Sequence, residues 1–270
     1  MFGFGKRKQA GATRAEGTRG DPVISAVLMQ GTTFPFDALQ QRLSNFAIVG
    51  TKPSGLQLEK DGILTFNVGD ELFALALMPA PYPWSDLEGP CHTSWMWPPG
   101  TSATSVKAHK THLLVTAVGG KSDPIARRVA LTQVTAHAAQ LPGVMGVYWP
   151  DATMVHFPKI FIEMSKAASV EAPPMYLWVD FRIFRNADGT SGLFTTGLAP
   201  MGQMEIEIPR IDMPPGELRE WAINIAYYFL EQGDKVKDGH TIGMTAEQQI
   251  RIRHRPSQFD RPGKVIRLEA

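Results

Sequence analysis

Two short turns between apolar runs constrain the fold of this chain most. Gly69-Asp70 separates "ILTFNV" from "ELFALALMP", and Asp188-Gly189 lies in "NADGTSG" between two further runs. Glycine adopts the positive φ that tight turns require, so each stretch predicts a β-hairpin. Turns this short join antiparallel strands, because parallel strands need a much longer crossover.

Helical signals fall between the strand-like runs. The clearest helix begins at Pro124, where Ser122 or Asp123 serves as the cap, and it ends before Pro142-Gly143. Further helices are predicted near residues 37–46, with Asp37 as a cap, and over 158–168 and 215–232. This order of elements predicts an α+β fold with mainly antiparallel sheets and helices packed on one face.

Two later stretches also have strand character. Leu177, Val179, Phe181 and Ile183 alternate with more polar neighbours, which predicts a strand that begins near residue 176. The basic runs "IRIRHR" and "KVIRLEA" are interpreted as two edge strands.

The N-terminus differs from the rest of the chain. Residues 1–20 carry five basic side chains against Glu16, and no apolar run follows, so this is not a secretory signal. A second compositional break, "VEAPP", lies at residues 170–174. We expect a disordered basic tail over 1–21, with a phosphate-touching arm as the alternative, and two packed α+β subdomains over 22–170 and 171–270.

Composition excludes several classes of protein. The chain has 270 residues, a formal net charge of +1 and one cysteine, Cys91. An intrachain disulfide is therefore impossible, and the chain has no global field that would attract nucleic acid or an anionic membrane. No segment approaches the roughly 20 apolar residues of a membrane span. A lone cysteine fits a reducing cytosol, so we expect a cytoplasmic protein.

Residues 79–100 combine six prolines with three tryptophans, Trp84, Trp95 and Trp97. Proline fixes φ and removes a hydrogen-bond donor, so this segment is predicted to contain no long regular element. Its aromatic surface either packs against the protein or awaits a partner.

Glu205 and Glu207 form the first candidate site. In a strand their side chains share one face, while Ile206 and Ile208 point to the core. Carboxylates this close repel unless a cation, a metal ion or water lies between them. We interpret the pair as an outward, arginine-paired or partner-facing patch. Four arginines on other predicted strands could supply the charge: Arg182, Arg185, Arg251 and Arg253.

Asp238 and His240, in "DGHTIG", form a second candidate. With the two glutamates they would make an oxygen and nitrogen set suited to a metal ion, although Asp-Gly is above all a turn signal. The chain lacks a dinucleotide fingerprint, a Walker loop, GxSxG, HExxH and zinc-type Cys/His spacing. No catalytic residue, metal or cofactor is therefore predicted.

Several longer phrases carry a family resemblance. They include "PAPYPWSDLEGP", "GVMGVYWPDA", "YLWVDFRIFRNADGTSGLFTTGLAPMGQMEIEI" and "NIAYYFLEQGDKVKDGHTIG". On these phrases the chain resembles the bacterial domain-of-unknown-function family 4261 over roughly residues 22–270, most specifically from 177 to 243. That family has no established reaction, so the resemblance implies no catalytic residue.

The chain also resembles cytoplasmic immunity proteins that are paired with nuclease effectors of type VI secretion. This implies a protein that binds and neutralises a toxin. The implied partner is a protein toxin. The resemblance implies neither membrane association nor direct binding of nucleic acid, and it is compatible with a homo-oligomer. The expected contact residues are Trp84, Trp95, Trp97, Glu205, Glu207, Asp238 and His240. The competing hypotheses are a metal-dependent hydrolase that uses Glu205, Glu207, Asp238 and His240, and a regulatory module without a toxin.

Overall fold

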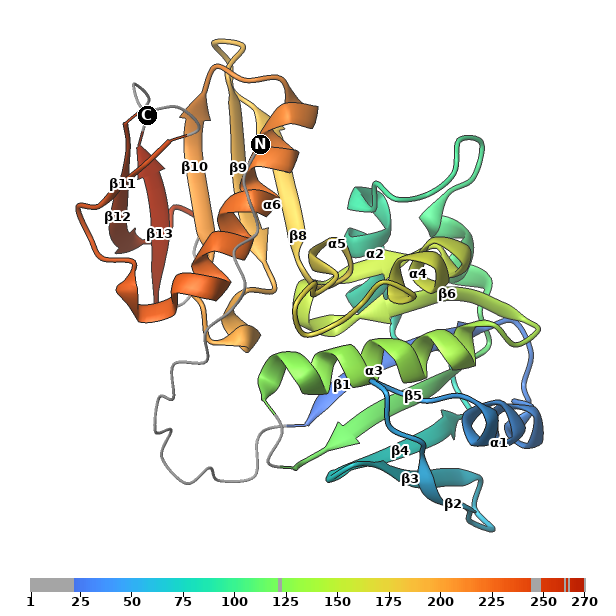
Figure 1. The fold of residues 1–270 in the computed structure, drawn as a ribbon. Coiled ribbons are helices and arrows are strands. Elements are labelled where there is room, and N and C mark those ends of the chain that lie inside the picture. Colours follow the sequence, from blue (N-terminus) through green and yellow to red (C-terminus); the bar gives the residue numbers. More distant parts are fainter. Residues whose placement is uncertain (1–21, 121–122, 244–248, 260, 262, 270) are drawn as a thin grey trace.

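The computed structural model describes residues 22–269 except 121–122, 244–248, 260 and 262. The predicted basic tail, residues 1–21, lies outside the described residues, and so does Ser122. Two sheets with helices packed on them make up the described chain (Figure 1). The α+β class and the mainly antiparallel pairing are thus confirmed.

The first sheet has seven strands within the described residues, in the order β2-β3-β4-β5-β1-β6-β7. All its pairs are antiparallel. Its strands are β1 (Val23–Met29), β2 (Ser54–Leu58), β3 (Ile63–Val68), β4 (Glu71–Met78), β5 (Thr111–Val118), β6 (Val144–Trp149) and β7 (Met154–His156). Gly69, at φ 57°, occupies the β3–β4 turn, which confirms the predicted hairpin.

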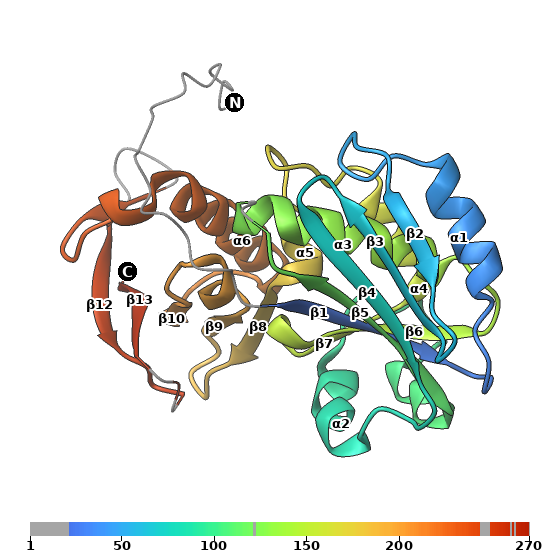
Figure 2. The same cartoon turned by 90° about the horizontal axis from the view of Figure 1, so that it is seen from below.

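Helices α1 (Phe36–Asn45), α3 (Pro124–Ala139) and α4 (Pro158–Ser165) cover one face of this sheet (Figure 2). Helix α2 (Trp84–Thr93) and the 3-10 helix η1 (Ala103–Ala108) lie on the opposite face, over β1, β6 and β7. Alternation along β6 explains this, because Val147 and Trp149 join the main core while Tyr148 packs under α2.

The second sheet has the order β11-β12-β13-β10-β9-β8. Its strands are β8 (Asp180–Arg185), β9 (Ser191–Thr196), β10 (Ile206–Ile211), β11 (Thr241–Ile242), β12 (Ile250–Pro256) and β13 (Lys264–Glu269). Helix α6 (Pro215–Gln232) packs on it, and β10 pairs with β13 in parallel. Short helices connect these elements: η2 (Pro150–Ala152), α5 (Met175–Trp178), η3 (Ala199–Met201) and η4 (Gly233–Lys235).

One buried core runs through both sheets. Trp149 of β6 and Trp178 of α5 stack with ring centroids 6.4 Å apart, and the Trp178 indole N–H donates to the Thr132 hydroxyl on α3 at 2.8 Å. Both tryptophans are almost completely buried. The division into residues 22–170 and 171–270 stays a prediction. None of the helices in the described part of the chain combines the length and apolar character needed to cross a membrane.

Residues 79–100 are not one long regular element, but they contain a helix that the sequence did not predict. Helix α2 spans ten residues there, with Pro83 before its first turn and Pro90 inside it. Leu87 and Cys91, one turn apart, are buried against the first sheet. Burial of this apolar stripe outweighs the backbone hydrogen bond that Pro90 cannot donate.

Three local predictions also need correction. Residues 176–178 belong to the helical turn α5, and the strand begins only at Asp180, because Val179 N–H donates back to the Met175 carbonyl. Asp37 lies in the first turn of α1 but makes no side-chain cap. Strands β12 and β13 are both internal rather than edges, because β12 lies between β11 and β13, and β13 lies between β12 and β10. The cap predicted at Asp123 is confirmed, since its carboxylate accepts the Ile125 N–H at 2.8 Å.

Candidate functional site

Glu207 is buried, which overturns the expectation that it faces outward. Its side chain is 1% exposed and accepts hydrogen bonds from the Ser257 hydroxyl and from Gln258 N–H, the latter at 3.2 Å. Arg267 of β13 forms an ion pair with it at 3.3 Å. The β12–β13 connection therefore folds over this carboxylate, and Glu207 is a structural acceptor rather than a surface group.

Glu205 has a separate set of partners. It lies just before β10 and is half-buried. One oxygen accepts the N–H groups of Gly197, Leu198 and Ala199 at 2.9–3.0 Å, and the other accepts the Thr195 hydroxyl at 2.6 Å. The carboxylate thus satisfies the exposed N–H groups at the start of η3.

The expectation that the two carboxylates face outward together was therefore wrong. The arginine pairing was also placed on the wrong residues, because Arg267 contacts Glu207. Of the four arginines expected, Arg182 pairs with Asp180 at 2.5 Å and Arg253 with Glu269 at 3.7 Å.

Asp238 and His240 lie in the exposed turn before β11. Asp238 accepts the His254 N–H at 2.8 Å, and this bond lowers the pKa of its carboxyl. It lines a surface hollow of about 440 Å³ together with Lys237 and His254, and the described lining includes neither glutamate nor His240. Within the described residues, no three His, Cys, Asp or Glu side chains gather closely enough to hold a metal ion.

The three tryptophans are all half-buried, and each has a different setting. Trp97 donates its indole N–H to the Val155 carbonyl at 3.0 Å. Trp95 lies against Tyr176, and the Arg219 guanidinium stacks 4.2 Å from the Trp95 ring centroid, so it ties the loop after α2 to α5 and α6. Trp84 begins α2, with Lys107 5.1 Å from its ring centroid.

Two histidines hold the segment before α2 in place. His109 Nε2 accepts the Tyr82 N–H at 2.7 Å, and its Nδ1 donates to the Val106 carbonyl at 2.6 Å. His112 Nδ1 donates to the Ala80 carbonyl at 2.9 Å. Burial lowers the pKa of both imidazoles, so they are neutral near pH 7. We call residues 79–100, anchored in this way, the aromatic arm.

The aromatic arm carries a local charge that sequence reasoning missed. Asp86 and Glu88 are exposed on α2, and the arm contains no lysine or arginine. On this helix Glu88 lies one turn after Trp84, whereas Asp86 lies on the opposite side. Recognition of α2 as a helix would have placed exposed Glu88 beside half-exposed Trp84, whose ring also has Lys107 5.1 Å from its centroid.

Cys91 does not have the setting of a nucleophile. It is buried, and burial raises the pKa of its thiol to about 11. The thiol is therefore protonated at neutral pH, whereas a nucleophilic cysteine needs a thiolate.

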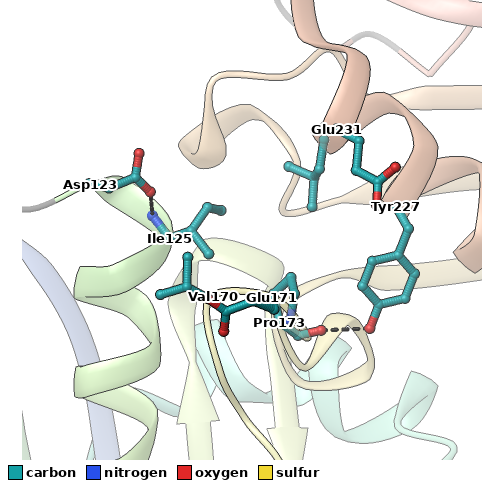
Figure 3. Close-up of a pocket in the computed structure, with 8 residues that line it drawn as sticks. Asp123, Ile125, Val170, Glu171, Pro173, Tyr227 and Glu231 are labelled. Carbon is teal, nitrogen blue, oxygen red and sulfur yellow. Dashed lines mark hydrogen bonds between the residues drawn. The ribbon is translucent and has the colours of Figure 1, made fainter. Parts of the chain in front are cut away.

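A hollow of about 320 Å³ lies between the start of α3, the 170–173 loop and α6 (Figure 3). Its lining includes the carboxylates of Asp123, Glu171 and Glu231 around an apolar floor. Tyr227 closes one side by donating its hydroxyl to the Pro173 carbonyl at 2.6 Å. The charge of this hollow suits a basic group.

The fold and these surfaces define an α+β protein with candidate contact residues on the aromatic arm and around the hollow between α3 and α6. Residues 194–269 match the family model described as "Domain of unknown function (DUF4261)". This match runs from within β9 to the end of β13 and supports the family resemblance over those residues, whereas the resemblance over residues 22–193 stays a prediction. No match was found among curated proteins or solved structures.

Proposed function

We propose that this protein is a cytoplasmic immunity protein that binds and neutralises a bacterial toxin, specifically a nuclease effector of type VI secretion. The observation that carries the proposal is the aromatic arm. Its helix α2 lies outside the first sheet (Figure 2). This helix presents half-exposed Trp84 and, one turn later, exposed Glu88, while exposed Asp86 lies on its other side.

The chemistry of this arm suits a nuclease. A nuclease binds phosphate through basic residues, and an inhibitor gains affinity and association rate by presenting opposite charge. The chain as a whole is nearly neutral, with a net charge of +1, so the acidic character has to be local. Tryptophan at the edge of such a patch supplies the apolar contact area typical of interface hot spots.

The settings of the residues that the competing hydrolase hypothesis requires do not favour catalysis. Glu205 and Glu207 accept hydrogen bonds from different loops, and His240 lies in an exposed turn. Their bonding gives each residue a structural role, so we favour binding over catalysis.

The test uses the full chain and a candidate toxin chosen from the products of the genes that neighbour its own. We expect the native chain to protect cells that produce the toxin and to bind it with an affinity that falls as salt rises. The double variant Asp86→Lys/Glu88→Lys should bind at least about tenfold more weakly and lose protection.

A matched control reverses two carboxylates elsewhere. Glu59 and Asp61 are exposed in the β2–β3 turn, and Glu59→Lys/Asp61→Lys should bind as the native chain does. If the native chain neither binds the toxin nor protects cells, the proposal fails. Equal loss in both double variants would show that the arm is not the contact surface.

A further inference from the structure

The first sheet has an open face. Helices α1, α3 and α4 cover one side, while α2 and η1 reach only β1, β6 and β7 on the other. The outward side of β3, β4 and β5 faces the viewer in Figure 2, with no described helix in front of it. We call the outward side chains of these three strands the open face.

The open face is mainly apolar, although Thr65, Asn67 and Thr116 also lie on it. Leu72, Met78 and Val118 are 38%, 39% and 38% exposed. Ala74 and Ala76 lie between Leu72 and Met78 on β4, and Val118 pairs with Leu72 across β4 and β5. Antiparallel sheets that face water normally alternate apolar with polar residues. Here "ELFALALM" is apolar after its first residue, as in strands that are covered on both sides, whereas "THLLVTAV" has His112 and Thr116 on its outward side.

The open face also lacks charge. Its outward positions on β3, β4 and β5 include no aspartate, glutamate, lysine or arginine. His112, at the rim, is held by the Ala80 carbonyl and is neutral. A partner selected by charge, such as a nuclease, finds nothing to recognise here, in contrast to the aromatic arm.

We propose that a second copy of this chain covers the open face, so that two first sheets pack face to face across a two-fold axis. In such a dimer a surface meets itself, and each charge near the axis would meet a like charge. An uncharged face avoids that repulsion. The small side chains of Ala74 and Ala76 let the second sheet approach to the roughly 10 Å typical of stacked sheets.

The open face is large enough for the centre of a dimer interface, but not for the whole of it. With strands about 4.8 Å apart and a rise of about 3.4 Å per residue, β3, β4 and β5 span roughly 350 Å². A stable interface buries about 800 Å² per partner, and its centre is more apolar than its rim. The open face therefore supplies an apolar centre, with the β2 edge and the polar turns around it as the rim.

Sedimentation of the full chain at about 1–100 µM tests the proposal. We expect a species with twice the mass of one chain. Leu72→Lys and Val118→Lys should each raise the dimer dissociation constant at least about tenfold, since each lysine would be desolvated or face its own copy. Both sites are already more than a third exposed, so the lysine stem can lie along the sheet while the fold persists.

Two further variants make the outcome decisive. Asn67→Lys changes an exposed polar residue of the open face and should also weaken the dimer. Tyr228→Lys changes an exposed apolar residue of α6, 44% exposed, and should leave the dimer intact. A native chain that stays monomeric at about 100 µM, or a dimer that Leu72→Lys leaves unchanged, would overturn the proposal. Toxin protection is a separate readout, so failure of either proposal is recognised independently.

Discussion

Replacement of Glu207 by alanine tests whether this carboxylate is structural or a surface group. The side chain is 1% exposed and accepts from Ser257, Gln258 and Arg267. Its removal leaves a charged guanidinium and two donors short of an acceptor. Loss of one partner from a buried ion pair costs about 3–5 kcal/mol. Arg267 is 14% exposed, and water can reach part of it, so we expect the lower end, about 3 kcal/mol.

Urea unfolding followed by circular dichroism measures this loss. A change of about 3 kcal/mol alters the unfolding constant by more than 100-fold and lowers the urea midpoint by about 1 M or more at an unchanged slope. Glu88→Ala is the matched control, because this exposed carboxylate should cost less than about 0.5 kcal/mol. A loss of less than about 1 kcal/mol for Glu207→Ala would refute the buried assignment and restore the outward-facing interpretation.

Three other substitutions have expected outcomes. Burial lowers the pKa of His156 to about 4 from an unfolded value near 6.5. The neutral imidazole therefore leaves the free energy of unfolding at its full value above about pH 6.5. This free energy decreases by up to about 3 kcal/mol as the pH falls towards 4, because the unfolded chain binds the proton first. Urea midpoints of His156→Gln should therefore fall less steeply over this range than those of the native chain, and parallel curves would contradict the assignment. Gly197 has a φ of 122°, and a Cβ at this position would meet the Trp178 carbonyl oxygen, so Gly197→Ala should lower the free energy of unfolding by about 3 kcal/mol. Gly216 has open space around it, so Gly216→Ala should be close to neutral in the same assay. Arg127→Met breaks a buried ion pair with Glu71, at 3.0 Å, and should lower the free energy of unfolding by about 3–5 kcal/mol. The double variant Arg127→Met/Glu71→Met should lose less, because it leaves neither charge buried alone, and a larger loss in the double variant would contradict this reasoning.

Much of the local structure was readable from the sequence. The Gly69-Asp70 hairpin, the Asp123 cap and the end of α6 at Gly233 depend on residues within one turn of each other. Turn geometry and capping chemistry act over that range, so sequence alone predicts them. The antiparallel class followed from those turns.

The α2 helix was hidden from sequence reasoning for a physical reason. Its prolines argue against a helix, and its hydrophobic stripe is only Leu87 and Cys91. The helix forms because the outer side of β1, β6 and β7 offers those two residues a place to pack. Tertiary burial of the apolar residues thus outweighed local helix propensity. Because the helix was not predicted, the positions of the exposed carboxylates of the aromatic arm were not predicted either.

Glu205 and Glu207 show the same division most clearly. The sequence by itself determined that Ile206 and Ile208 face the core, because alternation along a strand is a local property. It could not determine what covers the other side. Ser257, Gln258 and Arg267 come from 50 to 60 residues further along the chain, and only the tertiary structure brings them over Glu207. The alternation of a strand assigns side chains to two faces, whereas the packing of distant segments decides which of those faces meets water.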